Sequence, residues 1–342
     1  MGSFLLKFFK WLKKEIRGYL LLRGILVLMP LAYLFSVTKN YAWLQVSVVS
    51  MSSLIVKEKL KLTILGVLLH GLSIIILFNL LFLTQFQPLL FIIICTLSAV
   101  AIILITMRGD KLRTLGNWTF IPAIILSIEL ASKMRYSFWT ESQQIFPFLL
   151  LSLLPTLCLS LYDQIKILKN EHPFKALQLS YLSDFGKKQN NLEAMLAMGL
   201  GIIIASFIVE YLPMQNGQWM IWGVASVVTG DSETSPKKFK QRLIGVSLGV
   251  PLGIAFAQYI IPSTPFDLII VTTCLFLTLV AFRRYVVAYT LRCFFVASAV
   301  ILITHSKTIA FERLSHVIEG GLIGLTAVFL SRLLFKKMRF TS

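Results

Sequence analysis

Apolar runs of about the length that crosses a bilayer follow one another along almost the whole chain. Hydrophobic residues make up 57 % of the 342 residues, and charged residues only 14 %. A water-soluble domain cannot bury that much apolar surface, so lipid must be the solvent for most of the chain. The sequence therefore predicts an all-α, polytopic membrane protein with the lipid bilayer as its main partner.

Twelve segments are candidates for membrane spans, six before a polar stretch at 163–190 and six after it. The first six are 19–37, 41–56, 60–84, 88–107, 117–134 and 144–163, and the second six are 191–212, 217–230, 239–261, 265–282, 285–304 and 313–335. The second segment of each half is short for a full crossing, which needs about 20 apolar residues.

The two halves repeat one pattern. Trp43 opens an apolar run and matches Trp219, which lies 176 positions later (219 − 43). A hydrophilic break and a basic cluster follow in both copies, after which Gly66 matches Gly245 at an offset of 179 (245 − 66). An insertion in the second copy accounts for the change of offset. We therefore expect a tandem duplication, with about 12 transmembrane helices arranged as two six-helix repeats.

Basic residues fall mainly on one side of the predicted membrane if both termini are cytoplasmic. The inner loops then hold Lys57, Lys59, Lys61, Arg108, Lys111, Arg113, Lys166, Lys169, Lys175, Lys187, Lys188, Lys237, Lys238, Lys240, Arg242, Arg283 and Arg284, and the outer loops hold Lys39, Lys133, Arg135, Lys307 and Arg313. This distribution satisfies the positive-inside rule. Because each half has an even number of spans, the repeats would be parallel, related by an axis along the membrane normal. The net charge of +18 is thus explained without nucleic acid.

The predicted organisation has five parts. They are an amphipathic interfacial helix at 1–17, a membrane repeat at 18–163, a cytoplasmic linker at 164–190, a second membrane repeat at 191–335 and a basic tail at 336–342. The first part mixes aromatic residues with lysines, as do helices that lie on an anionic leaflet. The four cysteines are isolated in apolar runs, and none has the spacing of a metal or redox motif. The chain also lacks the common enzyme motifs, so we expect no enzyme, no cofactor and no metal.

Polar groups at membrane depth are the remaining candidates for function, because burying them in lipid is costly. Arg292 lies well inside the eleventh predicted span and could attract an anionic substrate, or it could pair with a neighbouring helix. Arg23 lies nearer the start of the first span, where its side chain can instead snorkel to the surface. We take both as candidate substrate-binding residues.

Three titratable residues are candidates for proton coupling. Asp231 and Glu233 lie in the break at 230–236, where a short apolar segment meets a capped helix start; the alternative is a plain solvated loop. His70 lies in the middle of the third predicted span, although a histidine there can equally be a hydrogen-bonded packing residue.

Two tryptophans and four glycines are the remaining candidate residues. Trp43 and Trp219 are expected to anchor helices at the interface, or to stack on an aromatic substrate. Gly66 and the row Gly245, Gly249 and Gly253 predict close helix packing, between the halves or between protomers.

These residues resemble the fusaric acid resistance (FUSC) family, which includes aromatic acid exporters and is distantly similar to plant malate-permeable anion channels. The features that match are Trp219, Lys238–Arg242, Ile244–Gly245, Gly249 and Gly253, with a weaker copy at Trp43, Lys59–Lys61 and Gly66. Longer members carry a cytoplasmic domain, where this chain has the short central linker. The resemblance implies proton-driven export of carboxylate-bearing, often aromatic, compounds, sometimes with a periplasmic adaptor protein.

The sequence and the resemblance together predict a secondary efflux transporter for organic anions in a bacterial inner membrane. A passive anion channel is one alternative, because it also needs cations along its path. A non-transporting membrane subunit or scaffold of a multi-protein system is another. A homodimer and a monomer are both compatible with two repeats in one chain.

Overall fold

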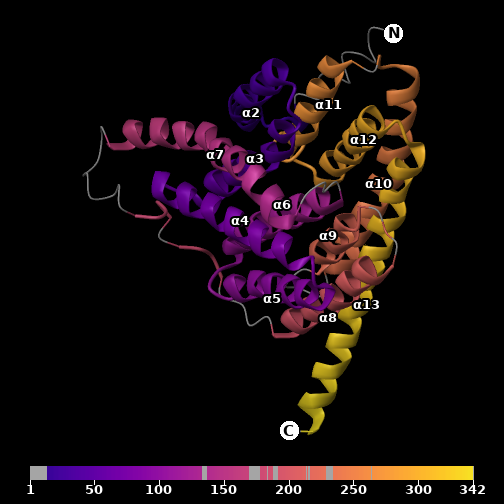
Figure 1. The fold of residues 1–342 in the computed structure, drawn as a ribbon. Helices are drawn as coiled ribbons and strands as arrows, with labels where there is room; N and C mark the ends of the chain where they lie inside the picture. The colour runs from indigo at the N-terminus through magenta and orange to yellow at the C-terminus, as the bar shows by residue number, and fades with distance from the viewer. Residues whose placement is uncertain are drawn as a thin grey trace. The chain divides into compact units, whose positions relative to one another are not determined.

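The computed structural model describes residues 14–132, 137–168, 178–182, 184–187, 192–212, 214, 216–228, 234–262 and 264–341, with side chains up to 336. These residues form α-helices and one 3₁₀ turn (Figure 1). The helices are α2 (Gly18–Thr38), α3 (Ala42–Leu60), α4 (Ile64–Thr84), α5 (Pro88–Thr106), α6 (Arg113–Ser132), α7 (Phe138–Leu168), α8 (Leu192–Tyr211), α9 (Gln218–Val227), α10 (Thr234–Tyr259), α11 (Pro265–Leu277), α12 (Tyr285–Thr304) and α13 (Lys307–Thr341), and the 3₁₀ turn η1 is Asp110–Leu112. The predicted interfacial helix lies mostly outside the described residues.

Each of the twelve predicted segments contains a helix, but the helices are not equally suited to cross a bilayer. Within the described residues, nine helical segments are long and apolar enough to span. The other three are α3, α9 and α11. Helix α9 has 10 residues and α11 has 13, which is short of the roughly 20 that a crossing needs. Helix α3 is long enough, but serines and charged residues lower its hydropathy.

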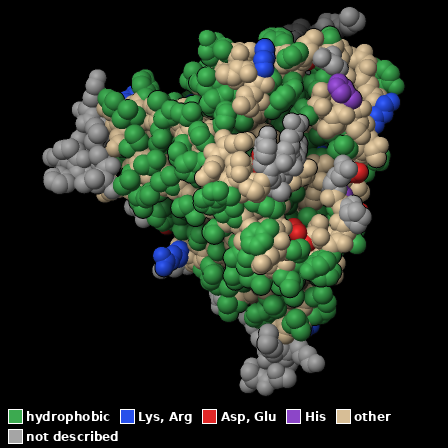
Figure 2. All heavy atoms as spheres, in the orientation of Figure 1, with side chains coloured by type: hydrophobic (Ala, Val, Ile, Leu, Met, Phe, Trp, Pro, Cys, Tyr) green, Lys and Arg blue, Asp and Glu red, His purple; other side chains and the backbone are tan. Residues whose placement is uncertain are grey.

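Large apolar side chains remain exposed on the spanning helices, as expected where lipid replaces water. In α2, the side chains of Leu22, Leu26 and Met29 are 58 %, 53 % and 60 % exposed, whereas Leu28 and Leu31 of the same helix are buried. Hydrophobic atoms cover much of the face shown in Figure 2. The chain is therefore described as a multi-pass membrane protein.

The fold consists of two compact units. Unit 1 comprises Met1–Ser47 and Gln241–Leu314, and unit 2 comprises Val48–Lys240 and Ser315–Ser342. In unit 1, α11 packs against both α2 and α12. The segment before α2 is tied to the turn between α11 and α12, because the Arg283 amide donates to the Glu15 carbonyl over 3.0 Å and Glu15 forms an ion pair with Arg284 at 2.6 Å.

In unit 2, α4 packs against α6 and α7, and α5 packs against α6 and α8 (Figure 1). The described part of the linker lies along the ends of these helices. The Thr63 amide donates to the Leu179 carbonyl over 3.2 Å, and the Lys111 amide donates to the Phe185 carbonyl over 3.1 Å. Phe185 also packs against the hydrophobic cluster that includes Leu60 and Val67.

Both units contain the same kind of pairing. In unit 2, the helix α8, which opens the second half, packs on α5 of the first half. In unit 1, the helix α2, which opens the first half, packs on α11 of the second half. The segment before each opening helix also receives a backbone hydrogen bond from the turn that follows α5 or α11. Each unit therefore combines helices from both predicted halves.

Candidate functional site

Arg292 is buried within unit 1. It lies in α12, its side chain is 8 % exposed, and its Nε lies 3.5 Å from the hydroxyl of Thr278. Its guanidinium carbon lies 5.9 Å from the centre of the Tyr289 ring, one turn earlier in the same helix. Arg292 was predicted to lie well inside an apolar segment, and in the fold it is indeed buried.

Two further buried arginines lie around the same tyrosine. The guanidinium carbon of Arg242, from α10, lies 4.6 Å from the centre of the Tyr289 ring, and Arg313, from α13, is close enough to interact with Tyr289 electrostatically. Arg242 is 2 % exposed and Arg313 is 1 % exposed. We refer to Arg242, Arg292 and Arg313 as the arginine cluster. A stacked pair of rings, Tyr285 and Tyr289, lies beside it.

The row of glycines in α10 brings this helix against α12. A Cβ atom on Gly249 would lie 2.3 Å from the carbonyl oxygen of Thr290, and one on Gly253 would lie 2.2 Å from that of Phe294. A Cβ atom on Gly245 would lie 2.5 Å from the Tyr289 ring. The glycine row thus allows the backbone approach that places Arg242 over Tyr289. Its contact is with α12 of the same predicted half, whereas a contact between halves or protomers was expected.

The described part of unit 1 contains few acidic residues. Its acidic residues are Glu15, Asp267 and Glu312. Glu15 pairs with Arg284, and Asp267 forms the capping box that begins α11. Glu312, next to Arg313 in α13, is therefore the one acidic residue of this part of unit 1 on the elements that carry the cluster. Three buried guanidinium groups close to one another give this region a concentration of positive charge, which can attract an anion.

The structure places the other predicted substrate residues differently. Arg23 is half-buried in α2, and its guanidinium carbon lies 4.5 Å from the centre of the Tyr19 ring, which agrees with snorkelling toward the start of the helix. Trp43 and Trp219 are buried, at 7 % and 6 % exposure, so their rings lie inside the protein. The Trp219 ring lies 6.4 Å from that of His316 in unit 2.

Among the predicted proton-coupling residues, His70 is buried in α4 beside the backbone of Trp118. Asp231 and Glu233 lie outside the described residues. Gly66, the predicted packing residue of α4, faces the linker, since its Cβ atom would lie 2.1 Å from the carbonyl oxygen of Leu179.

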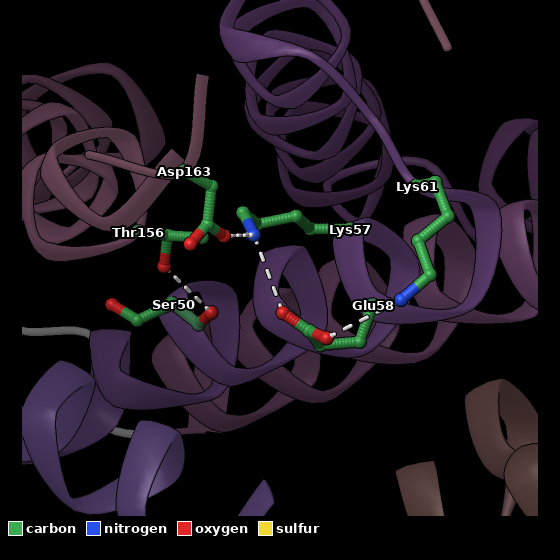
Figure 3. Close-up of polar contacts among 6 residues, drawn as sticks. All are labelled: Ser50, Lys57, Glu58, Lys61, Thr156 and Asp163. Carbon is green, nitrogen blue, oxygen red and sulfur yellow. Dashed lines mark hydrogen bonds and ion pairs between the residues drawn. The ribbon is translucent and has the colours of Figure 1, made fainter. Parts of the chain in front are cut away.

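The structure contains a second charged site, which the sequence did not predict. Lys57, at the end of α3, is 5 % exposed and forms ion pairs with Glu58 at 3.2 Å and with Asp163 of α7 (Figure 3). Lys61 approaches the other oxygen of Glu58 at 3.9 Å. We refer to Lys57, Glu58, Lys61 and Asp163 as the α3–α7 charge network.

Hydroxyl groups continue the contact between α3 and α7 on one side of this network. The Ser50 hydroxyl donates to the carbonyl oxygen of Ser152. The Thr156 hydroxyl donates to the carbonyl oxygen of Ser50 over 3.1 Å (Figure 3). Ser152, Thr156 and Ser160 are all buried and recur at every fourth position of α7. That spacing puts them on one helix face and is visible in the sequence, so it could have pointed to a polar face of α7.

The sequence did not predict the network because two helices are longer than expected. The second segment was predicted to end at 56, with Lys57 in an inner loop, but α3 continues to Leu60. The sixth segment was predicted to end at 163, but α7 continues to Leu168. Among the residues that the structure describes, no group of three metal-binding side chains comes together.

Comparison with known families identifies one match. A family model described as fusaric acid resistance protein-like matches residues 204–327, which include α9 to α12 and the whole arginine cluster. No curated protein and no solved structure matched the chain in the other two comparisons. The predicted resemblance to this family is therefore confirmed, and the similarity to plant channels stays a prediction. Residues 204–327 are similar to the fusaric acid resistance protein-like family, within a multi-pass membrane protein.

Proposed function

We propose that the chain is a secondary transporter that exports organic anions, such as aromatic carboxylic acids, across a bacterial inner membrane. The observation that carries this proposal is the arginine cluster, three buried guanidinium groups around Tyr289 in unit 1. The match of this part of the chain to the fusaric acid resistance protein-like model supports it.

The physical reason is the cost of burying like charges. A buried cation loses several kcal/mol of hydration, so an anion that binds close to three buried guanidinium groups gains a strong electrostatic attraction. A carboxylate can accept two parallel hydrogen bonds from a guanidinium group, which gives both strength and orientation. The stacked Tyr285 and Tyr289 offer ring faces on which an aromatic acid can pack.

The reciprocal helix pairings support the proposed duplication. A chain made of two equivalent repeats would pack α8 on α5 as it packs α2 on α11, and both pairs are present. We propose that α3, α9 and α11, together with the residues that flank them, also cross the membrane, so that each half has six crossings, the repeats run parallel and both termini are cytoplasmic. Homodimer formation and a periplasmic adaptor protein are further proposals, which rest on the repeat count and on the resemblance.

The test is transport by the purified protein in proteoliposomes. Radiolabelled benzoate and succinate serve as the aromatic and aliphatic probes, each with and without a pH gradient, and protein-free liposomes give the leak. Arg292→Gln is expected to reduce protein-dependent flux by at least tenfold, because it removes a charge from the anion site. Arg283→Gln is the matched control, since Arg283 is an exposed arginine of the same unit.

The outcomes separate the alternatives. Uphill movement that requires the pH gradient supports a coupled exporter, whereas downhill movement that ignores the gradient indicates a passive anion channel. Equal losses in Arg292→Gln and Arg283→Gln would contradict a specific role for the arginine cluster. Absence of protein-dependent flux of either probe would favour the scaffold alternative.

A further inference from the structure

We propose that Tyr289 and Arg292 together bind the carboxylate of the transported anion. The Tyr289 hydroxyl donates a hydrogen bond to one carboxylate oxygen, and the Arg292 guanidinium group donates to the other. Transport of this anion rests on the proposed function, but its binding does not. Tyr289 was not among the candidate residues that the sequence offered, and its contact gives the anion a defined position within the arginine cluster.

The first reason is the hydroxyl of Tyr289. The side chain is 0 % exposed, and its hydroxyl has no hydrogen-bond partner among the residues that the structure describes. Arg242 and Arg313 are close enough to interact with Tyr289 electrostatically, but a guanidinium group has no acceptor atom for the hydroxyl proton. A buried donor without an acceptor costs free energy. A carboxylate oxygen is an acceptor that removes this cost.

The ring that carries this hydroxyl is held by its neighbours. The Tyr285 ring stacks with it at a distance of 5.6 Å between ring centres and an angle of 15° between ring planes. The guanidinium carbon of Arg242 lies 4.6 Å from the ring centre, and Arg242 is itself hydrogen-bonded to the Tyr285 side chain. Gly245 lies so close that its Cβ atom would be 2.5 Å from the ring. The hydroxyl is therefore fixed before the anion arrives, which lowers the entropic cost of binding.

Arg292 supplies the positive charge for the same carboxylate. It lies three positions after Tyr289 in α12, so the two side chains are neighbours on one helix face. Within the described residues Arg292 forms no ion pair, and its hydrogen bond is a long one, 3.5 Å from Nε to the Thr278 hydroxyl. That hydroxyl already donates to the Leu275 carbonyl over 2.6 Å. The two terminal nitrogens of the guanidinium group are therefore available to the anion.

The chemistry of the two groups selects the ligand. A guanidinium group and a hydroxyl proton are both donors, so the ligand must bring acceptors and a negative charge. A carboxylate has two oxygens and can accept a hydrogen bond on each. Hydrogen bonds between charged partners are roughly twice as strong as those between neutral ones. Tyr285 is half-buried beside the pair, where its ring can contact the aromatic part of an acid.

The deciding experiment is isothermal titration calorimetry of the purified protein with benzoate and with succinate. In Tyr289→Phe the ring and its stacking remain, and the hydroxyl is lost. We expect the Kd of benzoate to rise by about tenfold or more. The Tm of the ligand-free variant should stay constant or rise, because the lost hydroxyl had no partner among the described residues. Tyr259→Phe is the matched control, since this tyrosine of α10 is 82 % exposed, and it should keep the wild-type Kd and Tm.

Several results would overturn the binding role. They are a benzoate Kd in Tyr289→Phe within about twofold of the wild type, a lower Tm of the ligand-free variant, which would show that the hydroxyl already has a partner, and the absence of saturable binding of either probe to the wild type. Benzoate binding that depends on Tyr289, without flux of benzoate or succinate in proteoliposomes, would refute the proposed function alone. Flux with an unchanged half-saturating concentration in Tyr289→Phe would refute the binding role alone.

Discussion

Replacing Gly249 with alanine should separate α10 from α12 and destabilise the arginine cluster. The new Cβ atom would lie 2.3 Å from the carbonyl oxygen of Thr290, 2.8 Å from the Cβ atom of Cys293 and 3.0 Å from the amide nitrogen of Phe294. Two of these neighbours are backbone atoms, which cannot rotate away as a side chain can. One helix must therefore shift by more than half an ångström (3.0 − 2.3) to reach even the shortest distance that real Cβ atoms show.

The magnitude follows from two opposing contributions. Overpacking of this kind costs about 1–3 kcal/mol. Alanine in place of glycine stabilises a helix interior by up to about 1 kcal/mol. The net loss should be about 1–2 kcal/mol, which lowers Tm by roughly 2–8 °C for a chain of this size class.

The assay is thermal unfolding of the purified protein in detergent, followed by size exclusion to count the folded fraction. Gly199→Ala is the matched control, because the Cβ atom on this glycine of α8 would meet one neighbour at an ordinary 3.6 Å. We expect the Tm of Gly199→Ala to stay constant or rise. The reasoning would be refuted if Gly249→Ala were as stable as Gly199→Ala. Benzoate flux should fall with Gly249→Ala, since the shift moves Arg242 away from Tyr289.

Two further predictions concern unit 2. In a double-mutant cycle of Lys57→Gln and Asp163→Asn, the coupling energy from unfolding should be about 1–3 kcal/mol, nearer the lower limit because Asp163 is partly exposed; additive effects would contradict the ion pair. Gly66→Ala should loosen the linker, because its Cβ atom would lie 2.1 Å from the carbonyl oxygen of Leu179. The expected result is faster limited proteolysis within 163–190, and an unchanged cleavage rate would show that the docked linker does not depend on this glycine.

Helix positions could be predicted well from the sequence. An apolar run of membrane length is a local feature, and its partner is the bilayer rather than another part of the chain, so each run can be interpreted by itself. The predicted segment 285–304 and α12 share the same limits. The errors lie at helix ends: α3 and α7 continue past the predicted limits because polar and charged residues extend them. Length also separated α9 from the spanning helices, as its short apolar run indicated.

Site residues were predictable only in part. The depth of Arg292 in an apolar run marked it as a candidate, since a charge there is costly wherever the helix packs. Arg242 and Arg313 gave no such signal and were interpreted as residues of an inner and an outer loop. The structure instead places both within helices, where they are buried. A basic residue near the end of an apolar run can face water or turn inward, and the run itself does not distinguish the two.

The sequence by itself determined that the chain is a helical membrane protein, where its helices lie, and that its two halves share a pattern. Only the tertiary structure decided which charges meet. Lys57 and Asp163 are 106 positions apart, and Arg242 and Tyr289 lie on different helices. Their contacts depend on how closely two helices approach and in which rotation, and those are set by glycine rows and hydroxyl pairs acting together. Hydropathy can be summed along the chain, whereas packing depends on how two helix surfaces fit together. The charged contacts of both sites could therefore be identified only from the tertiary structure.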